Sequence, residues 1–130
     1  ISLTKDRVAD SGAVCTYVEK SDDILLYADE GQITQILINL IKNATEADAG
    51  RIEITAEINL SEHVIINVFN DGRAISKESR EEIFVPFFTT KQEGTGIGLS
   101  LSRQIMRLHN GTLTLTQSDE NGTIFTLIFR

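Results

Sequence analysis

The sequence is first informative for what it contains little of. It has one cysteine, one proline, no tryptophan and only 6% aromatic residues among 130 residues. A single cysteine, Cys15, excludes an internal disulfide, and we expect it to be a small core residue in a strand of a domain from a reducing compartment. No part of the sequence has the roughly 20 consecutive apolar residues that a membrane-spanning helix needs. We therefore expect a cytoplasmic domain with no direct membrane insertion.

Basic residues are also scarce, with 12 Lys and Arg against 19 Asp and Glu, for a net charge of −7. Nucleic-acid binding is not expected, because it usually needs a basic stripe on the protein. A nucleotide ligand is compatible with this charge, since glycine amides, one or two lysines and Mg²⁺ can hold phosphates. The two histidines, His63 and His109, lack partners at metal-ligand spacing and are interpreted as structural or exposed.

The length predicts one domain with one core. Residues 1–11 are mixed and polar, and we interpret them as the tail of a connection from an upstream domain, with residues 12–130 as the domain itself.

Hydrophobic periodicity predicts the element order β-β-α-β-β-α-α-β-β. The longest element is a helix with Asp29 as its N-cap, an apolar stripe from Ile33 to Ala47, and Gly50 as its end. Alternating strand pairs and helices predict an α+β, two-layer α/β sandwich, with a mixed, mainly antiparallel sheet and the helices on one face. The predicted strands cover residues 14–18, 24–27, 52–56, 66–68, 112–116 and 123–129, and the two shorter helices cover residues 76–83 and 97–108.

The most distinctive motif lies where the last predicted helix begins and reads Gly94-Thr95-Gly96-Ile97-Gly98-Leu99. Alternate glycines let the backbone approach a ligand closely, and a helix N-terminus offers unpaired N–H groups with a partial positive charge. Together these features predict a phosphate site. Alone the motif is a weak signal, because many turns are rich in glycine.

Two asparagines, Asn39 and Asn43, lie one turn apart on the long helix, at the border of its apolar stripe. They are either surface amides, which helix statistics favour, or ligands. In the second interpretation the side-chain oxygen of Asn43 binds a hard cation such as Mg²⁺, which takes few protein ligands and completes its shell with phosphate and water.

The run Asn70-Asp71-Gly72-Arg73 follows a predicted strand and is a turn by its composition. Strand ends are also where ligand-binding groups often emerge. A side-chain oxygen of this turn is suited to accept the exocyclic amine of adenine, and Gly72 would let the backbone approach the base.

A second loop signal combines Thr89, Thr90 and Lys91 with three nearby phenylalanines, Phe84, Phe87 and Phe88. The polar cluster is either a solvated loop or a lid whose lysine meets phosphate. The aromatic density is higher than a core needs at a loop, and anchoring the lid or docking a partner would explain it.

Combined, these motifs resemble a known family. Residues 35–47 resemble the N box of sensor histidine kinases, and residues 70–75 stand where the first glycine box belongs. Residues 83–91 look like the F box, and residues 94–99 resemble the second glycine box with the short lid of the nitrogen-regulator-like subgroup. The resemblance covers nearly the whole chain, and it implies an ATP-binding catalytic domain of the GHKL superfamily that holds ATP with Mg²⁺ under the lid.

The resemblance also implies roles for individual residues. Asn39, Asn43 and Lys91 would be catalytic, and Asn43 would bind Mg²⁺. The residues that would contact the nucleotide are Asn39, Lys42, Asn43, Glu46, Asn70, Asp71, Gly72, Ala74, Ile75, Phe84, Thr89, Thr90, Lys91, Gly94, Thr95, Gly96, Ile97, Gly98 and Leu99.

Three features qualify the resemblance. The first glycine box reads Asn-Asp-Gly-Arg-Ala-Ile, so Asn70 stands where the family has the adenine-reading Asp, and Ala74 replaces a glycine. Either Asn70 accepts from adenine without charge assistance or Asp71 takes over its role. Asn39 stands where related ATPases carry a general-base Glu, which favours phosphoryl transfer over hydrolysis, although Glu46 is a nearby acid.

The phosphoacceptor histidine itself would belong to a helical dimerisation hairpin upstream of this chain, which would pass the phosphoryl group to a response regulator. The alternatives are a nucleotide-sensing or scaffolding pseudokinase and a GHKL ATPase or serine kinase.

Overall fold

The computed structural model describes residues 14–26, 28–80, 82–85 and 98–130. Its elements in chain order are β1 (Val14–Glu19), α1 (Glu30–Glu46), β2 (Arg51–Ile58), β3 (Val64–Asn70), α2 (Gly98–Leu108), β4 (Gly111–Asp119) and β5 (Gly122–Phe129). The predicted connection at residues 1–11 lies outside the described residues.

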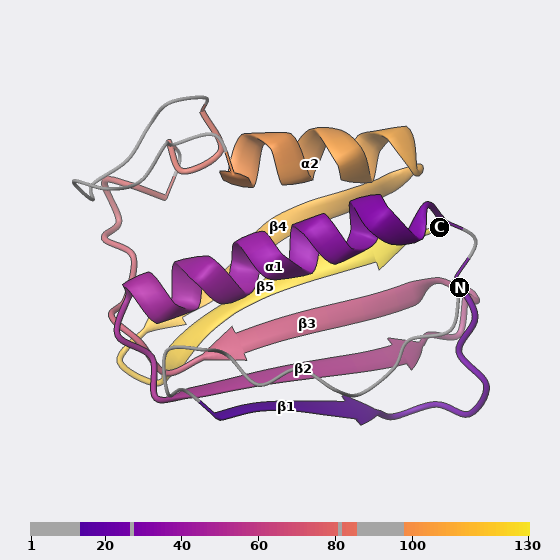
Figure 1. Cartoon of the computed structure of the whole chain (residues 1–130), viewed down its shortest axis with the longest axis horizontal. Coiled ribbons are helices and arrows are strands. Elements are labelled where there is room, and N and C mark those ends of the chain that lie inside the picture. The colour runs from indigo at the N-terminus through magenta and orange to yellow at the C-terminus, as the bar shows by residue number, and fades with distance from the viewer. Residues whose placement is uncertain (1–13, 27, 81, 86–97) are drawn as a thin grey trace.

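The five strands form one sheet in the order β1-β2-β3-β5-β4, with β1 parallel to β2 and every other pair antiparallel. Both helices lie on one face of this sheet (Figure 1). The predicted two-layer sandwich with a mixed, mainly antiparallel sheet is therefore confirmed. Neither described helix is long and apolar enough to cross a membrane.

Helix α1 is stabilised by a capping residue at its start and by an apolar face that packs on the sheet. The carboxylate of Asp29 accepts a hydrogen bond from the Gln32 backbone N–H (2.9 Å), which satisfies one of the free donors at the helix start, as predicted. The apolar positions recur every three or four residues and face the sheet, and the fully buried ones are Ile33, Ile36, Leu40 and Ala44. Burying such a side chain contributes about 1.5–3 kcal/mol for the larger residues, so packing holds this helix in place.

The prediction that Gly50 ends α1 is wrong. The helix ends at Glu46, and the left-handed residue that follows is Asp48, with φ of 62°. The N–H of Asp48 donates to Thr45 O (3.0 Å) and that of Ala49 to Ala44 O (3.1 Å), which is the Schellman pattern that usually requires glycine. Asp tolerates this conformation better than most residues. Asp48 therefore takes the position after the helix that the sequence predicts for Gly50, two residues later.

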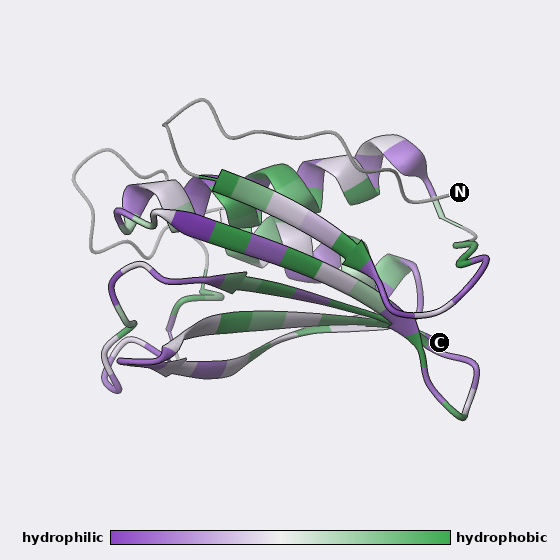
Figure 2. Ribbon diagram, turned by 90° about the horizontal axis from the view of Figure 1, so that it is seen from below, coloured by the Kyte–Doolittle hydropathy of each residue, from purple (hydrophilic) through white to green (hydrophobic). Residues whose placement is uncertain are grey.

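The core lies between the helices and the inner face of the sheet. Hydrophobic and hydrophilic residues alternate along the strands (Figure 2), because successive side chains point to opposite faces. Helix α2 adds Ile105 and Met106 to this core. The strands contribute Ile52, Ile54, Ala56, Val64, Ile66, Val68, Leu113, Phe125, Leu127 and Phe129. Cys15 is half-buried in β1 and packs against the core, and burial raises the pKa of its thiol.

The predicted strand at residues 24–27 is not formed in the described part of that segment. Ile24 and Leu26 are buried in the core, whereas Leu25 is 59% exposed and makes only an isolated bridge. The alternation that suggested a strand is therefore real, but it belongs to an extended segment without a continuous partner; Tyr27 lies outside the described residues.

The predicted short helix at residues 76–83 is also wrong for the residues described there. Ser76 caps the segment as expected, since Ser79 N donates to its hydroxyl (3.3 Å), but the chain continues as turns. A helix of eight residues gains too few hydrogen bonds to offset its nucleation cost, so side-chain contacts with the sheet decide its path instead.

The hairpin between β4 and β5 generates a stability prediction. Gly122 has φ of +132°, and a Cβ atom there would lie 2.2 Å from the Phe69 ring, whereas a Cβ at Gly50 would meet nothing within 4 Å. We expect Gly122→Ala to lower the free energy of unfolding by about 2 kcal/mol or more. Gly50→Ala, the matched control, should change it little. Urea denaturation measures both, and equal effects would contradict the prediction.

Candidate functional site

The described site residues gather at one end of the molecule. The C-terminal end of α1, the end of β3 and the start of α2 all lie on the same side (Figure 1). The end of α1 carries Asn43 and Glu46, β3 leads into the loop at residues 70–75, and α2 begins at Gly98. Elements that are far apart in the sequence thus bring three of the four predicted motifs together.

The loop after β3 is fixed against the end of α1. Asn70 is 5% exposed, and its Oδ1 accepts a hydrogen bond from Gly72 N (2.9 Å). A Cβ at Gly72 would lie only 2.7 Å from Ala47 O, so glycine is required for this close approach. The next N–H, of Arg73, donates to the same Ala47 oxygen (2.9 Å).

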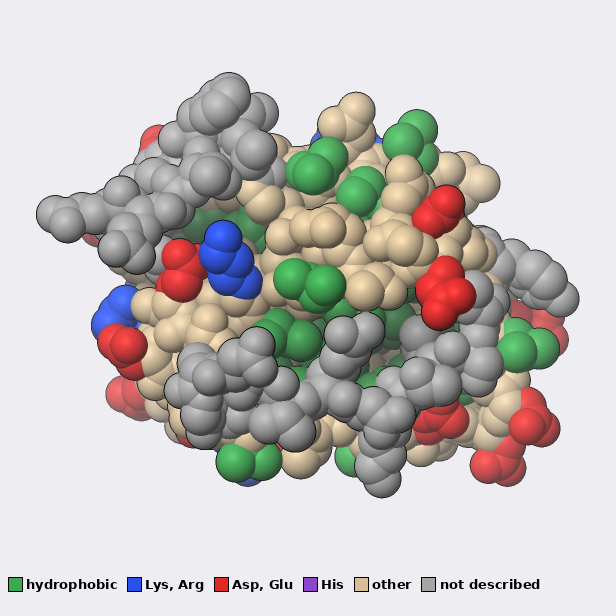
Figure 3. Space-filling model, viewed as in Figure 1, with side chains coloured by type: hydrophobic (Ala, Val, Ile, Leu, Met, Phe, Trp, Pro, Cys, Tyr) green, Lys and Arg blue, Asp and Glu red, His purple; other side chains and the backbone are tan. Residues whose placement is uncertain are grey.

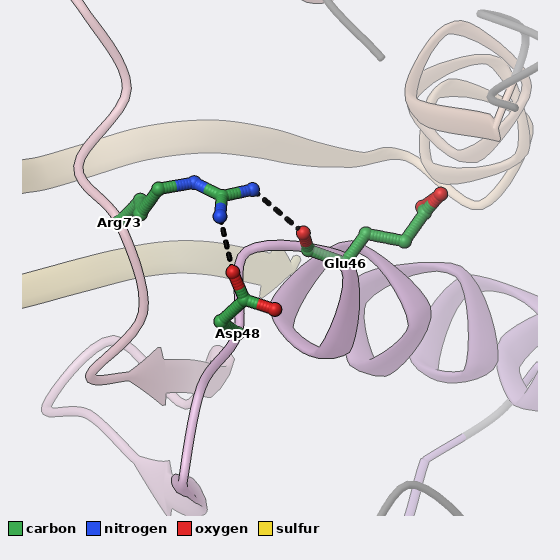
Figure 4. A network of polar contacts seen from close by, with 3 residues as sticks. All are labelled: Glu46, Asp48 and Arg73. Atoms are coloured by element: carbon green, nitrogen blue, oxygen red, sulfur yellow. Dashed lines mark hydrogen bonds and ion pairs between the residues drawn. The ribbon is translucent and has the colours of Figure 1, made fainter. Parts of the chain in front are cut away.

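Arg73 strengthens the same junction through its side chain (Figure 4). Its guanidinium donates to Glu46 O (2.9 Å) and forms an ion pair with Asp48. These bonds satisfy carbonyl groups that a helix leaves free at its C-terminus, and they place a cation at the negative end of the helix dipole. Both ionic side chains are largely exposed, so the ion pair itself adds little stability.

The Asp71 side chain is hydrogen-bonded to the start of the neighbouring strand β2. Its Oδ1 accepts hydrogen bonds from the N–H of Arg51, the first residue of β2 (2.9 Å), and from that of Gly50, the residue before it (2.8 Å). The backbone N–H of Arg51 is the main cause that holds the pKa of Asp71 below its ordinary value of 3.8. The Asn70 side chain is therefore hydrogen-bonded within the loop, whereas that of Asp71 holds the loop against the sheet.

Asn39 lies between the two helices. Its Nδ2 donates to Gly98 O (3.3 Å) and to Ser102 Oγ (3.2 Å), and its Oδ1 accepts from Gln35 Nε2 (3.1 Å). Asn39 thus contacts the last glycine of the predicted phosphate loop. Leu99, the next residue, is half-buried against the core.

Asn43 differs from Asn39 in that its side chain has no hydrogen-bonding partner within the described part of the chain. It is half-buried on the same helix face, one turn toward the C-terminus. Lys42 beside it is exposed, and Glu46 is half-buried. The described residues include no group of three or more His, Cys, Asp or Glu that could hold a metal ion. A cation that takes one amide oxygen from the protein and the rest of its shell from phosphate and water fits the donor that is available.

Sequence reasoning missed the polar contacts that hold residues 75–80 to the sheet. Ile75 N donates to Ser118 Oγ (2.7 Å), and this buried hydroxyl also bonds to that of Thr123 (2.8 Å). The Arg80 guanidinium donates to Ser118 O and to Ile75 O (3.4 Å). Nothing in the sequence marks Ser118 as the partner of Ile75 and Arg80, because it lies about 40 positions from both. Ala74, between the anchored residues, is exposed.

Phe84 belongs to a different cluster from the two asparagines. Its ring meets Phe125 edge-on, with centroids 6.4 Å apart, and the Arg103 guanidinium lies 4.0 Å above it. Phe84 and Arg103 border an open cavity of about 430 Å³ along β4, whose lining includes none of the other predicted nucleotide contacts. The structure therefore assigns Phe84 packing contacts with α2 and β5.

Residues 28–130 match the family described as histidine kinase-, DNA gyrase B-, and HSP90-like ATPase. This match covers well over half of the chain. The chain belongs to this ATPase family.

Its relatives within the family are sensor histidine kinases. The chain is 36% identical over 104 residues to sensor histidine kinase ZraS of Salmonella typhimurium, which is 78% of this chain and 22% of ZraS. The catalytic domain of histidine kinase ThkA superimposes with a TM-score of 0.76 at 38% identity, covering 88% of this chain and 76% of that one. Full-length ShkA in complex with AMPPNP gives a TM-score of 0.79 at 25% identity, covering 92% and 26%.

These comparisons confirm the resemblance inferred from the motifs: the domain is an ATP-binding catalytic domain of the histidine kinase type. Seven residues of the predicted nucleotide site of this kinase-type domain lie outside the described residues, namely Thr89, Thr90, Lys91, Gly94, Thr95, Gly96 and Ile97. Their roles stay predictions.

The hydrogen bonds of Asp71 predict that the free energy of unfolding of this kinase-type domain falls at acidic pH. Because the folded pKa lies below the ordinary value of 3.8, the carboxylate stabilises the fold above about pH 4 and loses this effect as the pH falls through the folded pKa. Asp71→Asn keeps an acceptor for Gly50 and Arg51 but carries no charge. We expect it to be less stable than the wild type at pH 7 and to lose less stability between pH 7 and pH 3. Urea midpoints at both pH values measure this, and parallel losses would contradict it.

Proposed function

We propose that this domain binds ATP with Mg²⁺ and transfers the γ-phosphoryl group to a histidine on a separate helical hairpin, from which a response regulator would receive it. The observation that carries the proposal is the pair of asparagines on α1. Asn39 holds Gly98 at the start of α2, and Asn43, one turn away, keeps an uncommitted side-chain oxygen. A free oxygen one helical turn from the residue that contacts a helix N-terminus suits a cation bound to phosphate.

Asn70 supports the adenine end of the same proposal. Its Oδ1 already accepts from Gly72 N, which fixes the direction of the amide, and a carbonyl oxygen has a second lone pair for another donor. An exocyclic amine is such a donor. Asp71 is not proposed in this role, because its Oδ1 is bonded to the start of β2.

Mg²⁺, when bound, would neutralise negative charge on the phosphates. Asn43 is the described residue that would hold it. The amides at the start of α2 would face the phosphates, and Asn39 would keep those amides in place through Gly98 O.

The chemistry of these residues favours transfer over hydrolysis. Phosphoryl transfer needs an in-line nucleophile and charge stabilisation more than covalent help from the protein. In the proposed step the bond from the γ-phosphorus to the bridging oxygen breaks, and a bond to an imidazole nitrogen forms. Asn39 carries no group that can take a proton from water near neutral pH, so a general base for hydrolysis is absent at this position.

The metal assignment can be tested on Asn43. We expect Asn43→Ala to reduce the affinity for Mg-ADP by at least about tenfold and to abolish phosphorylation of the hairpin histidine, because the protein would lose its oxygen ligand to the metal. Calorimetry measures the affinity, and radiolabelled ATP with the hairpin-containing kinase measures transfer.

Gln32→Ala supplies the control, since Gln32 is an exposed amide side chain on the first turn of the same helix. It should leave both measurements unchanged. Unaltered transfer by Asn43→Ala would show that the metal is held elsewhere.

The outer surface of the helices offers a place for the hairpin to dock. Hydrophobic side chains lie among polar ones over this surface (Figure 3). Those that are exposed on the two helices are Ile38 (45%), Leu101 (43%) and Leu108 (71%). Leu101 lies in the first turn of α2, which begins at Gly98, so a helix docked on it would bring its histidine near the proposed phosphates.

Leu101 gives this docking surface a direct test. We expect Leu101→Glu to reduce histidine phosphorylation by at least about tenfold while Mg-ADP affinity is unchanged, because a charge would oppose apolar docking. The matched control is Leu60→Glu at the β2–β3 turn, where the leucine is fully exposed but lies outside the helix layer. Equal effects of the two substitutions on transfer would contradict a specific docking surface.

A further inference from the structure

Ser102 is an unexpected residue on the buried face of α2. It is fully buried, on the same face as Ile105 and Met106. A buried hydroxyl is costly unless it is hydrogen-bonded, and an apolar residue would fill this position without that requirement. Its oxygen accepts from Asn39 Nδ2 (3.2 Å), so the serine is retained with a defined partner on the other helix.

The Asn39 amide uses both of its donors and one of its two acceptor positions in this arrangement. Its two N–H groups serve Gly98 O and Ser102 Oγ, and its oxygen accepts from Gln35. Because Gly98 and Ser102 are one helical turn apart, the single amide holds the whole first turn of α2. The two residues also pack together, since a Cβ at Gly98 would be in ordinary van der Waals contact with Asn39 Cγ, at 3.6 Å.

We propose that Ser102 is a positioning residue for the nucleotide. By fixing the Asn39 amide, it sets the position of the first turn of α2 and therefore of the backbone amides that would meet the phosphates. This inference rests on the proposed function. It adds a residue outside the four motifs, at a position where the motif pattern itself requires no hydroxyl.

The two helices are joined again at their other ends, which provides a matched comparison. The His109 Nε2, just beyond α2, accepts from Asp29 N (3.2 Å), the N-cap of α1. Its Nδ1 donates to Ile105 O (2.8 Å), so the ring is neutral and protonated at Nδ1 in this arrangement. His109 thus ties the same pair of helices by one interhelical hydrogen bond, at the end of α2 away from Gly98.

The experiment compares Ser102→Ala and His109→Ala in binding Mg-ADP by calorimetry, with thermal unfolding to establish that each variant is folded. We expect Ser102→Ala to weaken binding roughly 3- to 10-fold, which corresponds to one net hydrogen bond. His109→Ala should lower the melting temperature without changing the affinity. Ser102→Thr, which keeps the hydroxyl, should bind within about twofold of the wild type.

A second measurement does not depend on the ligand. In ¹⁵N NMR spectra of the free domain, the side-chain amide protons of Asn39 should shift in Ser102→Ala and stay in place in His109→Ala. Wild-type affinity in Ser102→Ala, or equal weakening by both alanine variants, would overturn the role of Ser102. Absence of Mg-ADP binding by the wild type would instead overturn the proposed function together with this inference.

Discussion

The site depends on the contact between the carbonyl oxygen of Ala47 and the loop that follows β3. This oxygen accepts the N–H of Arg73, and Gly72 lies so close that no side chain would fit. The contact joins the end of α1 to the end of β3, and through it the two halves of the proposed nucleotide site share one rigid frame. Without it, Asn43 on the helix and Asn70 on the loop would be held by separate elements. The guanidinium of Arg73 contacts the same helix end, where it donates to the carbonyl oxygen of Glu46 and forms an ion pair with Asp48.

Four arginines of this acidic domain make contacts within the protein. Arg73 and Arg80 donate to backbone carbonyls, while Arg103 and Arg51 lie over the rings of Phe84 and Phe69. Under the proposed function, phosphate charge would then be met by a metal ion, by backbone amides and by lysine, rather than by these guanidinium groups. An excess of negative charge and a nucleotide site are compatible because the neutralisation is local.

Much of the fold could be predicted from the sequence because its signals are local. Helical periodicity predicts the apolar stripe from Ile33 to Ala44, and two-residue periodicity predicts β2, β3 and β5. Asp29 is a typical N-cap residue and indicates where α1 begins. One error arose at the end of α1, where a residue other than glycine takes the left-handed conformation, and another arose where contacts with distant residues determine the path of the chain. Asp48 takes the left-handed position that Gly50 suggested, and Arg80 pulls residues 76–80 toward Ser118 instead of leaving them helical. Within the site, Asn39 was recognised by its motif. Ser102 was not, although a serine at a buried position of the α2 stripe is a signal that sequence alone contains.

The position of β5 has a consequence for how the chain is made. Strand β5 lies between β3 and β4, although it follows both in the sequence, so the inner edge of β3 has no partner until β5 has been synthesised. His109, which completes the start of α1, also emerges late. The first three strands and α1 can therefore gather early, but they present an unpaired edge and an incomplete core during synthesis. Loss of a few residues from β5 would weaken its pairing with both β3 and β4, whereas the same loss from the edge strand β1 would affect its pairing with β2 alone.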